Sequence, residues 1–193
     1  LSFWLKENLS MGSIDVNIMT KVDKTNYFKK EKLPSEYNDA HAGLRGYANS
    51  DLESAVIFSA GMNPRLYGYI AHFDDFFPDE NGDIRKKIIL KVSDYRSAVI
   101  QGKFLAKKGL WVSEYRIESG LNCGGHAFAT DGYLMGPILA EFRDKRQELI
   151  EDTYAVCKVA LQANERTIPE ETLPIKITAQ GGVATAEEHN FLI

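Results

Sequence analysis

Short apolar runs alternate with longer amphipathic stretches along this chain. Five of the runs have the length and the β-branched content of buried strands. They are residues 14–19, 55–61, 87–94, 111–120 and 173–182. Polar or glycine-rich residues follow each run, so the pattern predicts strands that end in loops able to carry chemistry.

Amphipathic stretches after the third and fourth runs predict helices. Residues 95–108 form the first helix, with lysines in its last turn and Gly109 as its stop. A longer helical stretch has Pro137 in its first turn. Another helix starts at Thr185, which forms a capping box with Glu188. Strands that alternate with helices predict an α/β fold with a parallel sheet.

The position of polar residues after all five strands favours a (β/α)8 TIM barrel over an isolated five-stranded parallel sheet. A closed eight-stranded barrel usually needs about 250 residues, and this chain has 193. We therefore expect residues 1–193 to be one partial barrel domain with about five of the eight strands. The chain starts inside an apolar run and ends just after a helix begins, so we expect a fragment of a longer protein.

Residues 21–49 are polar and rich in turn-forming residues, which predicts a long irregular loop. Loops of this length in compact domains are often functional. His41 and Arg45 lie in it and are able either to meet an acidic substrate or to form surface salt bridges.

Composition narrows the classes of partner. The net charge is −4 and there is no basic run, which argues against nucleic acid. No apolar stretch approaches the roughly 18 residues that span a bilayer, so we expect no membrane partner. Cys123 and Cys157 lie outside metal-ligand spacing, which indicates free thiols, a cytoplasmic protein and no metal site. A small-molecule substrate is expected, and a homo-oligomer stays open.

The most informative segment follows the fourth strand and contains Gly124, Gly125 and His126. Paired glycines let a ligand approach the backbone, and histidine exchanges protons near neutral pH. Glu118 and Ser119 precede this turn and are placed to order the histidine. The alternative is that His126 hydrogen-bonds a neighbouring carbonyl or faces solvent.

A second glycine turn, formed by Gln180, Gly181 and Gly182, separates the fifth strand from the next helix. Free N–H groups at such a turn and at a helix start make an anion site. A phosphate site and a tight turn that binds nothing are both compatible with the sequence.

Two polar residues interrupt apolar strands. Asn17 is able to hydrogen-bond a ring ligand or to be satisfied inside the barrel. Lys91 stands where an unpaired charge is costly. It is expected either to approach an anion or to pair with Asp94 or Glu118.

Four segments together resemble the nitronate monooxygenases, also called 2-nitropropane dioxygenases, and the related flavin-dependent enoyl-ACP reductases. They are Asp-Val-Asn-Ile (15–18), Ser-Ala-Gly-Met-Asn-Pro (59–64), Gly-Leu-Asn-Cys-Gly-Gly-His (120–126) and Ala-Gln-Gly-Gly-Val (179–183). Their order agrees with the family. The chain departs from it at Asn122 and Cys123, where the family usually has Glu-Ala, and in the long 21–49 segment.

The resemblance implies an FMN-binding TIM-barrel oxidoreductase, a flavoprotein monooxygenase with nitronate oxidation as its nearest reaction. His126 corresponds to the family's catalytic base, and the turn at Gly181 and Gly182 to its contact with the FMN phosphate. Asn17 corresponds to an asparagine beside the flavin, and Lys91 to a lysine near the cofactor. The remaining residues of the expected cofactor site are Glu118, Ser119, Gly124, Gly125 and Gln180. Reduction of an activated double bond and a non-catalytic barrel that binds a phosphorylated ligand are the alternatives.

Overall fold

The computed structural model describes residues 2–8, 12–20, 23–118, 135–181 and 185–192 of the chain. Its centre is a parallel sheet whose strands lie side by side in chain order. The strands are β1 (Val16–Ile18), β4 (Ala55–Phe58), β5 (Lys87–Val92), β6 (Val112–Glu118) and β7 (Lys176–Gln180). Strands β1 and β7 therefore form the two edges of the sheet.

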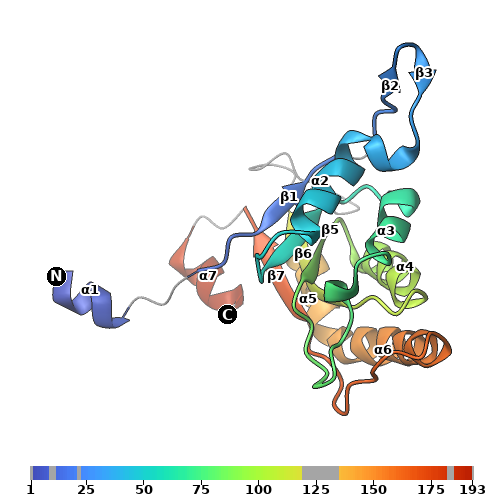
Figure 1. The fold of residues 1–193 in the computed structure, drawn as a ribbon. Helices are drawn as coiled ribbons and strands as arrows, with labels where there is room; N and C mark the ends of the chain where they lie inside the picture. Colours follow the sequence, from blue (N-terminus) through green and yellow to red (C-terminus); the bar gives the residue numbers. More distant parts are fainter. Residues whose placement is uncertain (1, 9–11, 21–22, 119–134, 182–184, 193) are drawn as a thin grey trace.

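Figure 1 shows several helices gathered on one side of this sheet. They include α2 (Asp39–Ala48), α3 (Pro64–Ile70), α4 (Tyr95–Ala106) and α6 (Arg146–Ala163). Right-handed crossovers between strands paired in chain order place the connecting helices on the same face. The other elements are α1 (Ser2–Asn8), η1 (Ser35–Tyr37), η2 (Asp74–Phe76), α5 (Met135–Asp144) and α7 (Ala186–Leu192).

The main core lies between the sheet and these helices. Strand side chains that point toward the helices are almost fully buried, among them Phe58, Leu90 and Tyr115. The opposite face has a much smaller apolar cluster, formed by Ala55, Ile57 and Ile89. Polar and charged side chains occupy much of the rest of that face, and the site described below is built on it.

The structure confirms the α/β class and the parallel sheet. All five predicted strands are present, each shorter than its apolar run, and α4 begins at Tyr95 as expected. Among the described residues β1 and β7 do not pair with each other, so the sheet is open there. Closure into a barrel stays a prediction.

The prediction of an irregular loop over 21–49 is wrong. This segment contains the hairpin β2 (Tyr27–Phe28) and β3 (Glu31–Lys32), then η1 and the ten-residue helix α2. The sequence of α2 resembles a loop because it contains Gly43 and Gly46. Beside Leu44 and Tyr47, the helix buries mainly small side chains, so its apolar pattern is weak. Tertiary packing on β1 overrides the turn preference of these glycines.

The long helical stretch after Pro137 is divided. Pro137 lies in the first turn of α5, as predicted, but α5 ends at Asp144 and α6 starts at Arg146. Val159 of α6 is 68% exposed. No helix in the described part of the chain is long and apolar enough to cross a bilayer.

Candidate functional site

A buried ion pair joins two neighbouring strands at their carboxyl ends. The Lys91 Nζ atom lies 2.6 Å from Glu118 Oε1, and the two side chains are 7% and 6% exposed. Lys91 is opposite Arg116 in the register of β5 and β6, so Glu118 lies one step further along the same face. Of the two partners considered for Lys91, the structure shows Glu118. Asp94 instead caps α4 by accepting a hydrogen bond from the Ser97 amide at 2.7 Å.

This pair leaves donor capacity for a ligand. A lysine ammonium has three N–H groups, and within the described ranges Glu118 is the one hydrogen-bond partner of Lys91. Both charges are removed from bulk water, which is costly unless each is compensated. A polar ligand at the carboxyl edge would supply that additional compensation.

The next strand adds two of the predicted residues. Gln180 on β7 is the register partner of Glu118. Gly181 follows at φ 77°, a left-handed conformation that glycine adopts without strain. The structure therefore brings together Lys91, Glu118, Gln180 and Gly181 at the carboxyl ends of β5, β6 and β7.

Asn17 lies to one side of this group of residues. It lies on β1, opposite Ile57, and its side chain is exposed. Two strand spacings separate β1 from β5, which puts Asn17 roughly 10 Å to the side of Lys91. Five other predicted site residues lie outside the described residues: Ser119, Gly124, Gly125, His126 and Gly182.

A second polar group on this face was missed from the sequence. The Glu114 carboxylate accepts hydrogen bonds from Arg116 Nε at 2.8 Å and from the Thr178 hydroxyl at 2.6 Å. Polar residues alternate with buried Tyr115 and Ile117 along β6, and this two-residue period was the available signal. The network holds β6 and β7 together below the Lys91–Glu118 pair.

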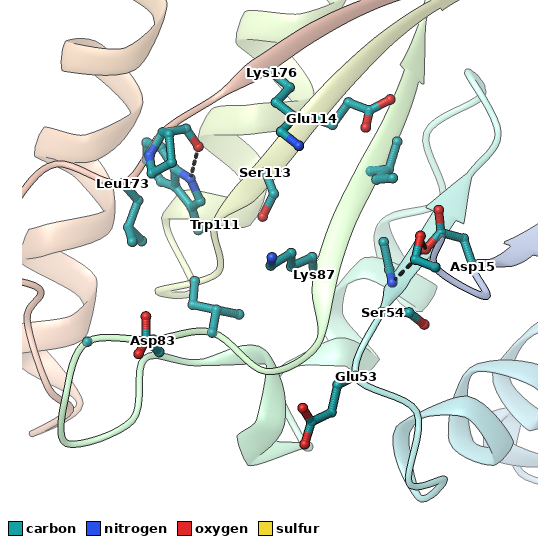
Figure 2. Close-up of a pocket in the computed structure, with 16 residues that line it drawn as sticks. Asp15, Glu53, Ser54, Asp83, Lys87, Trp111, Ser113, Glu114, Leu173 and Lys176 are labelled. Atoms are coloured by element: carbon teal, nitrogen blue, oxygen red, sulfur yellow. Dashed lines mark hydrogen bonds between the residues drawn. The ribbon is translucent and has the colours of Figure 1, made fainter. Parts of the chain in front are cut away.

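A cavity of about 490 Å³ lies at the opposite end of the strands, near their amino ends. Figure 2 shows Lys87 and Lys176 pointing into it, with Ser113 between them. Trp111 closes one side and donates from its indole N–H to the Pro174 carbonyl at 3.2 Å. This cavity therefore lies at the other end of the strands from the predicted chemistry.

His41 is not a surface residue as its predicted loop position implied. It lies in the first turn of α2 with only 3% of its surface exposed, and its Nδ1 atom hydrogen-bonds the Asp23 carboxylate. The same carboxylate accepts from the Ala40 amide at 2.8 Å. These contacts fix the segment before the β2–β3 hairpin to the start of α2.

Among the residues that the structure describes, no group of three or more His, Cys, Asp or Glu side chains is arranged to hold a metal ion. Comparisons of the chain with protein-family models, curated proteins and solved structures find no match.

Proposed function

We propose that this chain is part of a cytoplasmic FMN-dependent oxidoreductase of the nitronate monooxygenase type, acting on a small molecule. The observation that supports it most directly is the buried Lys91–Glu118 pair at the carboxyl ends of β5 and β6. Parallel α/β sheets place their ligands at this edge. His126 follows Glu118 by eight residues in the sequence.

A TIM barrel is the closed form that we propose for the sheet. Strands paired in chain order with helices on one face are what a barrel requires. A doubly wound sheet would instead reverse its strand order and carry helices on both faces. Within the described ranges no further strand pairs with the outer side of β1 or of β7, where a barrel would add its remaining strands.

The described residues fit an FMN group. The N–H groups of Lys91 that are not bonded to a described residue are suitable donors to the oxygen and nitrogen atoms of a flavin ring. Gly181, with its positive φ, lets a phosphate approach the backbone beyond β7. When bound, FMN would supply the redox chemistry, while the protein supplies position and electrostatics.

The side chains then have separate tasks. Glu118 holds the Lys91 ammonium in one orientation through the 2.6 Å contact. Lys91 binds and orients the ring. His126 removes a proton from the substrate carbon next to an electron-withdrawing group, which is general base catalysis.

Visible absorption of the full-length protein tests this proposal. The protein is incubated with FMN and desalted, and a retained flavin band is expected. Lys91→Met should weaken FMN binding about tenfold or more, because it removes a charged hydrogen-bond donor. Lys87→Met is the matched control, because Lys87 lies at the amino end of the same strand, away from Glu118.

Circular dichroism establishes that each variant is folded, and Glu118→Gln provides a second variant that keeps Lys91. His126→Ala assayed with a nitronate and with an enone then separates the two flavin reactions. A wild-type protein that retains no flavin contradicts the proposal, and so does equal loss of FMN in the Lys87 and Lys91 variants.

A further inference from the structure

The β2–β3 hairpin carries a tip of unusual composition. Tyr27 and Phe28 are each 63% exposed. The two turn residues, Lys29 and Lys30, have φ values of 47° and 71°, in the left-handed region. Hairpin turns of this kind prefer Asn and Gly, so lysine at both positions is strained.

The hairpin also differs in charge from the rest of the molecule. Residues 24–32 contain Lys24, Lys29, Lys30 and Lys32 against one acidic residue, Glu31, which gives a net charge of +3. The whole chain has a net charge of −4, so the remainder has −7. An extended anionic surface such as a bilayer or a nucleic acid would repel this remainder. The fitting partner is therefore a local acidic pocket.

Such a pocket exists at the other end of the same molecule. A cavity of about 640 Å³ lies between residues 80–83 and residues 167–174. Its lining has four carboxylates and no basic side chain, and none of the four forms an ion pair within the described part of the chain. These carboxylates belong to Glu80, Asp83, Glu170 and Glu171. Ile168, Pro169, Leu173 and Pro174 supply apolar surface.

We infer that the β2–β3 hairpin of one copy of this protein docks into the acidic cavity of a second copy. The charges are complementary, and the cavity volume lies in the range of about 300–1,000 Å³ that accommodates a ligand-sized group. Tyr27 and Phe28 are consecutive strand residues, so their rings face opposite sides of the hairpin. A cavity that surrounds the tip is able to contact both rings, whereas a flat surface contacts one.

The two surfaces cannot meet within one molecule. Figure 1 shows the hairpin at the top and the turns after η2 and α6 at the bottom, with the sheet between them. The contact is therefore made between copies. It closes a two-fold dimer if each hairpin enters the other copy's cavity, and otherwise it produces a head-to-tail ring or an open chain of copies. The inference does not depend on FMN binding.

Sedimentation velocity of the full-length protein, over a range of concentrations at low and high salt, tests the inference. Wild type should self-associate, and salt should weaken the association because the contact is electrostatic. Lys29→Glu with Lys30→Glu should weaken it about tenfold or more, and so should Glu170→Lys with Glu171→Lys. Lys107→Glu with Lys158→Glu is the control for net charge. Lys107 is exposed in the turn after α4, Lys158 is exposed on α6, and neither belongs to the hairpin or lines the cavity.

Mixing the variant with reversed hairpin charges (Lys29→Glu with Lys30→Glu) and the variant with reversed cavity charges (Glu170→Lys with Glu171→Lys) provides the decisive result. Each is defective alone, but the acidic hairpin of one complements the basic cavity of the other, so the mixture should associate again. A monomeric wild type at every concentration overturns the inference. It is also overturned if the control variant loses as much association as the hairpin variant, or if the mixture stays monomeric.

Discussion

Three lysines within six positions of one another occupy three different environments. Lys86 is fully buried, donates to the carbonyls of Ser50 at 2.9 Å and Leu52 at 2.7 Å, and lies over the Tyr47 ring. Burial lowers the pKa of Lys86. Lys87 is exposed and lines the cavity at the amino ends of the strands, whereas Lys91 is buried against Glu118. The local sequence does not show that Lys86 is buried and Lys87 exposed, because the burial of Lys86 arises from the loop that covers it.

Lys86→Met should lower the free energy of unfolding by about 1–3 kcal/mol, because two partly buried carbonyls lose their donor. Lys87→Met, one residue away and exposed, should change it by less than about 0.5 kcal/mol. Urea unfolding at neutral pH measures both values. Equal effects of the two substitutions would show that the contacts of Lys86 do not contribute to stability.

At the scale of elements, helix α4 meets strand β6 with very little space. A Cβ atom on Gly102 would lie 2.0 Å from the Tyr115 hydroxyl oxygen. That hydroxyl is buried and has no hydrogen-bond partner in the described part of the chain. The glycine therefore makes room for a polar atom that gains no hydrogen bond from its position.

Gly102→Ala should destabilise the protein by about 1–3 kcal/mol through overpacking, although alanine favours the helix. Tyr115→Phe removes the unsatisfied hydroxyl and should be neutral or stabilising by up to about 1 kcal/mol. In the double variant the cost of alanine should be much smaller, which a double-mutant cycle in urea measures. Simple additivity of the two effects would contradict this contact.

The sequence predicted the elements whose apolar pattern is strong and missed those that depend on packing. Strands β4 and β5 are nearly continuous apolar runs, so their positions followed directly from the sequence. Helix α2 was missed because its two glycines and small buried side chains resemble a loop. The choice of Glu118 as the partner of Lys91 needed the register between β5 and β6, which no local pattern gives.

At the scale of the whole molecule, the core contains several buried groups that lose a proton only at high pH. Burial raises the pKa of the Cys157 thiol from 9.0 to about 12. It also raises the pKa of the Tyr67 and Tyr115 hydroxyls above the ordinary value of 10.0. The folded protein therefore keeps these protons at pH values where an unfolded chain releases them.

Stability should consequently fall in alkali. Below about pH 8 these groups keep their protons in both states. Above it the unfolded state releases protons first, so the free energy of unfolding decreases as the pH rises. Urea unfolding from about pH 8 to about pH 11 measures the slope. Tyr115→Phe should reduce the slope, while Tyr27→Phe, at an exposed position, should leave it unchanged. Equal slopes in both variants would contradict the role of burial.

The sequence predicted where the candidate site lies better than it predicted which residues form it. Polar residues after parallel strands indicated the carboxyl edge, where Lys91, Glu118, Gln180 and Gly181 do gather. The cavity at the opposite edge was not predicted, because its lining comes from strand starts and loops that are distant in sequence. The catalytic role of His126 stays a prediction.

The strand order has a consequence for how the protein is made. Each strand of the main sheet after β1 pairs with the strand of that sheet that precedes it in the chain. A newly synthesised strand thus finds its partner edge already formed while the ribosome is still adding the rest. Native contacts accumulate from the amino end without waiting for a distant segment, which limits the time that any unpaired edge is exposed to other nascent chains.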